Sequence, residues 1–408
     1  MTTPKLSQTE AADLASSEWR PLIEPLAELA TSLLPRMVEP RQPQLRHELY
    51  RTLVSQVSAS YLGLLYADPR HPDFWPWFNM AHNNLGPNPD DVFGLTPIDG
   101  DGVYRISGFR GSVRIVDFQI GTGTFIPRGS FEDPVFSTTL ANHDLDSLRL
   151  SPDGAFEVIL SATRPSAYTG DWWELGPQAS YLLVRQIAYD WLHEVDARLA
   201  IERLDRPAVK PRPSAEELRA NLKQIAPWVA NNLKFTFDYV EGTRQQRGSN
   251  GIGFVNFTEY GGISVQKYAN GTFELEPDEA LILESSVPEC RYWGVQLVDD
   301  LFLSIDWMNR QTSLNGHTAR LDRDGRLRAV ISARDPGVPN WLDTAGYRSG
   351  GIQGRWKHSD QWPELRMFKV HVDRVREHLP DDTPAISLEE RDAAIRQRRR
   401  GAQLRRRW

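Results

Sequence analysis

The first part of the chain carries apolar residues at helical spacing. Between Thr9 and Tyr66 the leucines mostly recur at steps of three and four residues, which predicts helices with one apolar face. Pro35, Pro40 and Pro43 separate two such helices, because proline removes a backbone donor and clashes with the preceding turn.

After Asn88 the pattern changes to alternation of apolar and polar residues, which is typical of strands. Turn residues separate these short segments, and the expected strands are 103–106, 113–118, 156–160, 280–283, 292–298 and 327–331. Ile263–Tyr268 and Thr272–Leu275 flank Asn270-Gly271, and this pair predicts a hairpin because it accepts the positive φ angles of a tight turn.

A helical texture returns between the two strand-rich regions. We expect helices within Ser180–Leu204 and a further helix from Ser214 to about Asn232. The second helix is indicated by Ser214 and Glu217, which have the spacing of a capping box and follow a proline-rich linker.

These elements predict an α+β fold in which antiparallel sheets form sandwich-like or jelly-roll-like layers. No internal repeat is apparent in the sequence. The expected division is a helical N-terminal region (1–87), a first β region (88–178), a helical connection (179–245), a jelly-roll-like β domain (246–372) and a basic helical tail (373–408).

Length and composition are those of a globular protein with more than one core. The chain has 408 residues, of which 40% are hydrophobic and 25% charged, and this length favours two or three domains. It has no apolar run long enough to span a membrane, and its first ten residues do not resemble a signal peptide. The expected location is the cytoplasm.

The charge is distributed unevenly along the chain. Eight arginines and one aspartate lie between Arg391 and Trp408, although the net charge is −7. A basic tail on an acidic body fits either a solvated helical extension or a docking segment, for example one that holds a homo-oligomer together. The acidic body argues against a dedicated nucleic-acid-binding protein.

Several catalytic classes lack their signatures. The chain has no phosphate-binding G-x-x-x-x-G-K-[ST] loop, no H-E-x-x-H zinc helix and no G-x-S-x-G elbow. Its single cysteine, Cys290, excludes an intramolecular disulfide and is interpreted as a structural thiol. The nine histidines show no metal-ligand spacing, so we expect neither a metal nor another cofactor.

Two segments near the C-terminus collect side chains that can perform chemistry. A loop from Ser332 to Tyr347 follows an expected strand and carries Asp335, Asn340, Trp341 and Asp343, and Arg355 lies shortly after it. Loops on a rigid scaffold often carry binding and catalytic residues. An earlier segment contributes an acid, a guanidinium, an amide, an aromatic ring and a titrating base: Asp306, Trp307, Arg310, Asn315 and His317.

If both segments line one hollow, paired carboxylates can divide into acid and base as general acid–base catalysis requires. The expected catalytic residues are then Asp343, Asp335, Asp306, Arg310 and His317. The expected substrate-binding residues are Trp341, Asn340, Tyr347, Arg355, Trp307 and Asn315. The alternative is structural, because Asp–Arg pairs at strand ends are often plain ion pairs and Asn and His often cap backbone groups.

The same segments resemble a known family. Tyr292–Leu297, Asn309–Asn315, Asp335–Gly346 and Arg355-Trp356 look like the bacterial family called domain of unknown function 1214. The resemblance covers about 284–371 and is weaker over 101–114. It implies jelly-roll-like β architecture and transfers no catalytic residue, cofactor or substrate. Members often occur in bacteria that degrade lipophilic compounds.

Three functions remain open at the level of sequence. The first is a cofactor-independent hydrolase or lyase that acts on a partly apolar metabolite, such as a terpenoid, steroid or aromatic compound. The second is a non-catalytic protein that binds a sugar or a hydrophobic ligand. The third is an assembly factor whose arginine-rich tail docks on a partner.

Overall fold

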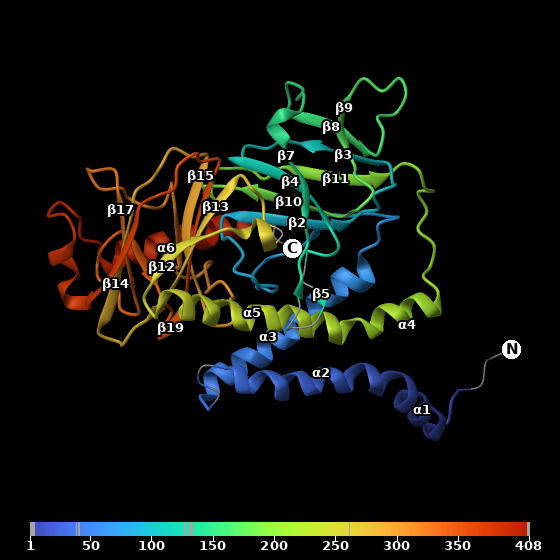
Figure 1. The fold of residues 1–408 in the computed structure, drawn as a ribbon, viewed down its shortest axis with the longest axis horizontal. Coiled ribbons are helices and arrows are strands. Elements are labelled where there is room, and N and C mark those ends of the chain that lie inside the picture. Colours follow the sequence, from blue (N-terminus) through green and yellow to red (C-terminus); the bar gives the residue numbers. More distant parts are fainter. Residues whose placement is uncertain are drawn as a thin grey trace.

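The computed structural model describes residues 5–37, 39, 41–125, 128–129, 134–260 and 262–405. The fold is α+β, with two β-sandwiches and a layer of helices along one side of both (Figure 1). The helices are α1 (Gln8–Leu14), α2 (Arg20–Leu33), α3 (Pro43–Tyr61), α4 (Ala215–Lys223), α5 (Ile225–Arg247) and α6 (Leu388–Leu404).

The first sandwich spans residues 75–203. One of its sheets has the order β1-β2-β10-β4-β7 and the other β11-β3-β8-β9. The strands are β1 (Trp75–Pro76), β2 (Asp91–Pro97), β3 (Tyr104–Phe109), β4 (Ile115–Thr122), β7 (Thr139–Asp144), β8 (Ala155–Ser161), β9 (Asp171–Glu174), β10 (Ala179–Ile187) and β11 (Arg198–Arg203); a separate small ribbon consists of β5 (Arg128–Gly129) and β6 (Pro134–Val135).

The second sandwich spans residues 252–371. Its sheets have the orders β12-β13-β19-β15-β16 and β18-β17-β14-β20. The strands are β12 (Ile252–Val255), β13 (Gln266–Glu274), β14 (Glu279–Ser285), β15 (Tyr292–Val298), β16 (Ser313–Asn315), β17 (Leu327–Ser332), β18 (Trp341–Asp343), β19 (Ser349–Lys357) and β20 (Leu365–His371).

The two sandwiches repeat one topology. Strand for strand, β1-β2-β10-β4-β7 corresponds to β12-β13-β19-β15-β16, and β11-β3-β8-β9 corresponds to β20-β14-β17-β18. The match includes one parallel pair at the same place in each half, β8 with β9 and β17 with β18. The chain therefore contains a structural repeat that its sequence does not reveal.

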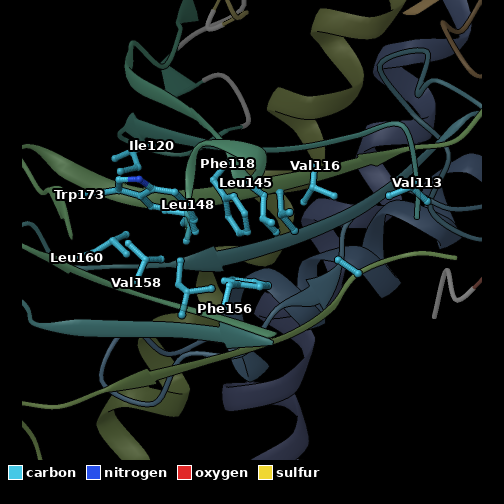
Figure 2. Close-up of a cluster of buried hydrophobic side chains, with 14 of the residues drawn as sticks. Val113, Val116, Phe118, Ile120, Leu145, Leu148, Phe156, Val158, Leu160 and Trp173 are labelled. Atoms are coloured by element: carbon cyan, nitrogen blue, oxygen red, sulfur yellow. The ribbon is translucent and has the colours of Figure 1, made fainter. Parts of the chain in front are cut away.

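Each sandwich has its own apolar core. In the first, alternate residues of β4 and β8 meet Trp173, and Leu145 closes the cluster (Figure 2). In the second, the core lies between β13, β15 and β19 on one side and β14 and β17 on the other. These cores confirm the sandwich predicted from alternation. Apolar residues at every second position of a strand lie on one face of its sheet, and a second sheet covers that face.

Two of the expected elements are wrong. Residues 179–203 form β10 and β11 instead of helices, so the helical connection begins only at α4. The apolar run Tyr181–Ile187 is buried almost throughout because β10 is a central strand, and such runs do not alternate. The Asn270-Gly271 hairpin is also absent, because both residues lie inside the continuous strand β13.

Other expectations are confirmed. The N-terminal segment is helical, Ser214 and Glu217 form the expected capping box, and the strands expected at 292–298 and 327–331 are β15 and β17. The two five-stranded sheets face each other across the molecule, and Tyr292 of β15 donates to Asp90, just before β2, over 2.7 Å. No helix within the described ranges is long and apolar enough to cross a membrane.

The C-terminal helix α6 binds back onto its own chain. Arg391 pairs with Asp335 of the second sandwich over 2.9 Å, and Arg405 pairs with Asp196 of the first over 2.6 Å. Both arginines are buried. The tail is helical over Leu388–Leu404, and Arg391 and Arg405 serve internal docking. An oligomer held through the remaining exposed arginines stays a prediction.

Candidate functional site

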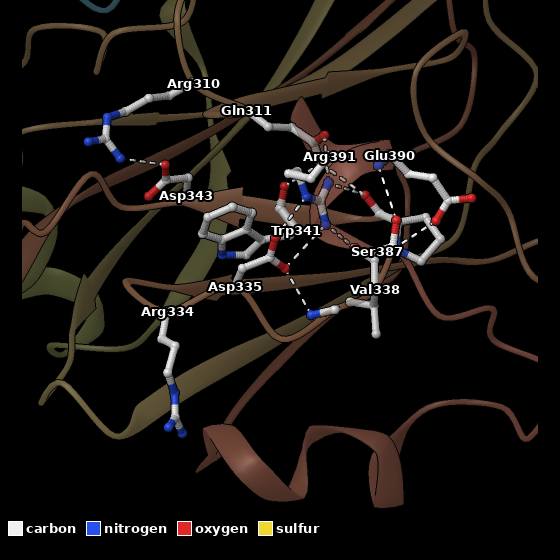
Figure 3. A network of polar contacts seen from close by, with 12 residues as sticks. Arg310, Gln311, Arg334, Asp335, Val338, Trp341, Asp343, Ser387, Glu390 and Arg391 are labelled. Atoms are coloured by element: carbon white, nitrogen blue, oxygen red, sulfur yellow. Dashed lines mark hydrogen bonds and ion pairs between the residues drawn. The ribbon is translucent and has the colours of Figure 1, made fainter. Parts of the chain in front are cut away.

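The loop singled out in the sequence is held by its own charges. Arg310 pairs with Asp343 over 2.7 Å (Figure 3). The same carboxylate accepts the Ala345 N–H. Asp335 accepts both from the Gly337 N–H and from Arg391 of α6. Arg310 and Asp343 therefore lie together as an ion pair. Both carboxylates, of Asp343 and Asp335, already have cationic partners.

Trp341 and Asn340 are buried inside this loop. The indole N–H of Trp341 donates to Ser332, and the Arg391 guanidinium lies 5.2 Å from its ring centroid. Asn340 donates to the carbonyl oxygens of Arg320 and Arg328. These contacts tie the strands together, which is the structural alternative considered for this segment.

The earlier segment is mostly structural as well. The Asp306 carboxylate caps the turn by accepting the backbone N–H groups of Met308 and Asn309. Trp307 belongs to the core of the first sandwich. Asn315 donates to Asp90 over 2.7 Å and so connects the two sandwiches.

The remaining predicted residues line three different cavities. His317 lies 3.8 Å from Asp190 at a cavity of about 260 Å³ beside α6. Tyr347 lines a cavity of about 290 Å³ under α3 and α5, next to Asp299. Arg355 lines a third cavity, between the two sandwiches. The predicted residues therefore do not converge on one hollow.

The inter-sandwich cavity combines an aromatic wall with a few polar groups. Its volume is about 120 Å³, and β2, β10, β13, β19 and α5 contribute to its lining. Aromatic rings form most of the wall: Phe78, Phe93, Phe125, Phe136, Phe235, Phe257, Tyr268 and Phe302. A concave apolar pocket with a small number of polar groups is the usual form of a small-molecule site.

The polar groups of this cavity are Asp91, Arg185, Arg355, Asn88, Gln266 and Gln353. Burial raises the pKa of the Asp91 carboxyl to about 6, against the opposing effect of Lys357, Arg185 and Arg355. Asn88 donates to Asp91 over 2.8 Å. A carboxyl group with a pKa this close to neutrality is suited to proton transfer.

The two arginines differ in their surroundings. Arg355 donates to Gln296, to Gln353 and to the carbonyl of Gly86. Arg185 is 7% exposed, and its Nη1 has no hydrogen-bond partner among the described residues. A buried guanidinium donor without a partner is costly, so this atom is available to an acceptor in the cavity.

Sequence reasoning missed Asp91 and Arg185. A signal existed for Arg185, because it interrupts the apolar run Tyr181–Ile187, and charged residues are rarely buried without a specific role. Asp91 follows Asp90 at the start of a strand, which by itself favours a turn. Their proximity depends on the pairing of β10 with β2, which the sequence does not state.

One further cluster offers metal-ligand atoms. Ligand atoms of Asp117, Asp144 and His358 lie within 4.8 Å of one another. Lys357 contacts Asp117, however, and Arg291 contacts Asp144. Each carboxylate therefore already has a cation, which makes an internal ion-pair network the better interpretation. Cys290 is half-buried, and burial raises the pKa of its thiol, as suits a structural thiol.

The chain is similar to solved structures of bacterial proteins. An uncharacterised protein from Burkholderia cenocepacia is 29% identical, covers 89% of this chain and 99% of its own, and superposes with a TM-score of 0.79. The VPA0106 protein from Vibrio parahaemolyticus is 12% identical over 78% of this chain and 98% of its own, with a TM-score of 0.45. The first likeness shows a shared fold.

No family model matches the chain, and no curated protein matches it. The resemblance to the domain of unknown function 1214 therefore stays a prediction.

Proposed function

We propose that this protein is a small-molecule enzyme whose active site is the cavity between the two sandwiches. The most direct support is that two groups occur together in one lining. Arg185 Nη1 is a buried donor without a partner among the described residues, and the Asp91 carboxyl has a pKa of about 6. The aromatic wall supplies a binding surface for a partly apolar metabolite.

In this proposal Asp91 is the general base. With a pKa of about 6 it is mostly ionised at pH 7 and still basic enough to remove a proton. The neighbouring guanidinium of Arg185 offers a donor to an anionic group of the substrate. The reaction class that fits is a hydrolysis in which Asp91 activates water, or an elimination in which it removes a proton from carbon.

A non-catalytic binding protein is the alternative function. The described lining contains no serine, cysteine, threonine, lysine or histidine, which leaves Asp91 and Tyr268 as its nucleophilic side chains. A cavity of this kind can hold an apolar ligand without transforming it.

The test is the Asp91→Asn variant, assayed against monocyclic aromatic and terpenoid esters and hydroxy acids with product detection by mass spectrometry. Because general base catalysis contributes roughly 10²–10⁴-fold, we expect turnover to fall by at least about 100-fold while ligand binding persists. The wild-type kcat/KM should rise with pH through about 6.

Asp343→Asn discriminates between the two locations. Asp343 pairs with Arg310 in the loop identified from sequence, at a distance from the cavity lining. Loss of turnover in Asp343→Asn with full activity in Asp91→Asn would assign the chemistry to the loop and overturn the proposal. Ligand binding without turnover in the wild type would favour the binding protein.

A further inference from the structure

The repeated topology makes Arg185 and Arg355 equivalent residues. Each is the seventh residue of a nine-residue strand, β10 or β19, and these strands occupy the same place in their sheets. Each also lies opposite an aromatic residue of the neighbouring strand, Phe93 for Arg185 and Tyr268 for Arg355. All four residues line the inter-sandwich cavity.

The two equivalent arginines differ in how many hydrogen-bond acceptors surround them. Arg355 is fixed by three acceptors of its own chain, the side chains of Gln296 and Gln353 and the Gly86 carbonyl. The residue that corresponds to Gln353 in the first sandwich is Leu183, two positions before Arg185, and leucine offers no acceptor. Gln119 corresponds to Gln296, and its side-chain nitrogen donates to Thr139 and Tyr181. Among the described residues, Nη1 of Arg185 is buried without a partner. One guanidinium is therefore structural, and the other has a donor left for a ligand.

The charge and size of the cavity restrict what that ligand is. Two guanidinium groups and one carboxyl group are present in the described lining, so a single negative charge balances them when Asp91 is ionised. A guanidinium binds a carboxylate through two parallel hydrogen bonds. The volume of about 120 Å³ and the surrounding aromatic rings leave space for one ring or a short branched chain.

We propose that Arg185 anchors the carboxylate of a small monocarboxylic acid whose apolar group packs among the aromatic rings. This inference rests on the cavity of the proposed function and names the substrate class that the cavity accepts. Arg355 acts as a positioning residue, because its hydrogen bonds fix β19 and the Gly86 loop around the same space.

The experiment compares three probes of similar shape by isothermal titration calorimetry: phenylacetate, phenylacetamide and phenethylamine. The wild-type protein should bind phenylacetate at least about tenfold more tightly than the amide, because a charge-assisted hydrogen bond is stronger than one to a neutral group, and it should bind the amine least. Arg185→Gln should remove the preference for the acid over the amide.

Arg355→Gln is the matched variant at the equivalent position. It should lower the melting temperature more than Arg185→Gln does, since it leaves the Gly86 carbonyl and two glutamine oxygens without their donor, and any remaining folded protein should keep the preference for the acid.

Equal affinity for acid and amide in the wild type, absence of binding by all three probes, or an unchanged preference in folded Arg185→Gln would overturn this inference. The wild-type comparison needs no variant and decides even if Arg185→Gln does not fold. This outcome can be told apart from that of the proposed function. If acids bind through Arg185 but are not converted, only the proposal that the protein is an enzyme is contradicted. If neutral compounds are converted in an Asp91-dependent reaction and acids are not preferred, only the role of Arg185 as carboxylate anchor is contradicted.

Discussion

Two buried aspartates have pKa values that burial moves close to neutrality. Asp91 in the inter-sandwich cavity and Asp299 beside the helical layer have raised pKa values, about 6 and about 7, and burial is the largest cause for both. Neither position stands out in the sequence, because an aspartate at a strand end is more often a turn residue. Their burial follows from contacts that only the folded chain makes.

Asp299 gives a stability prediction. Its pKa is raised from about 4 in the unfolded chain to about 7 in the folded protein, so the folded state holds the proton longer. Between pH 4 and 7 the folded state binds more protons than the unfolded state, and the free energy of unfolding should therefore decrease as pH rises. Above about pH 7 this contribution stops changing.

Asp299→Asn should remove that pH dependence. The asparagine oxygen can still accept the N–H groups of Leu301 and Leu303, which the Asp299 Oδ1 accepts at 2.9 Å, and asparagine does not ionise. Urea unfolding at pH 5 and pH 8 measures the effect. We expect the variant to be less stable relative to wild type at pH 5 than at pH 8; equal differences at both values would contradict the assignment.

At the scale of elements, α6 shows how a charged helix becomes part of the interior. Arg391 and Arg398 of the helix contact Asp335 and the Ser313 hydroxyl, and Arg405, which follows the helix, contacts Asp196. The sequence indicates a helix here, because strong helix formers follow Ser387. It does not indicate that the helix docks, since apolar periodicity is absent and the docking uses arginines.

The docking of α6 depends on Gly401, which gives a second prediction. A methyl group at this position would lie 2.8 Å from the Trp191 Cβ and 3.1 Å from its carbonyl carbon, closer than packed carbons allow. Gly401→Ala should therefore destabilise the protein by about 1–3 kcal/mol, although alanine is the better helix former.

Gly242 in α5 is the matched control. A methyl group added there meets nothing within 4 Å, so Gly242→Ala should stabilise the protein by about 0.5–1 kcal/mol. Melting temperatures of the two variants decide the matter. A gain in both would mean that α6 is not packed against Trp191 as described.

Other elements show where sequence patterns succeed and where they stop. Alternation identified β3, in which Tyr104 and Ile106 are buried and Arg105 and Ser107 are only partly so. It failed for β10, a central strand that is buried on both faces. Asn270-Gly271 has the composition of a turn, but Gly271 serves close approach instead, since an added Cβ would lie 2.7 Å from the Gly251 carbonyl oxygen.

At the scale of the whole molecule, the candidate site arises from how the two repeats face each other. Asp91 and Arg185 come from the first sandwich and Arg355 from the second. Only Arg355 was among the residues predicted from sequence, because local composition favours loops such as 332–347 over strands that meet across a domain boundary. A site that is built from equivalent strands of a repeat can be located only when the topology of the sheets is known.

The interface between the sandwiches contains a buried ion pair that should affect both stability and proton transfer. Asp117 of β4 and Lys357 of β19 are in contact, and both side chains are completely buried. Removing one partner leaves the other charge buried and alone, so Lys357→Met should cost about 3–5 kcal/mol in the free energy of unfolding. The double variant Lys357→Met/Asp117→Leu should recover much of this loss.

The same pair connects the interface to the proposed base. Lys357 lowers the pKa of Asp91 and so opposes the effect of burial. Without its charge the Asp91 carboxyl should ionise only at higher pH, and the inflection of kcat/KM should move upward from about 6. Protein that carries Lys357→Met and remains folded at low temperature is sufficient for this measurement. If Lys357→Met loses stability as expected but the inflection of kcat/KM stays at about 6, the ion pair does not influence the reaction. A group other than Asp91 then causes the inflection.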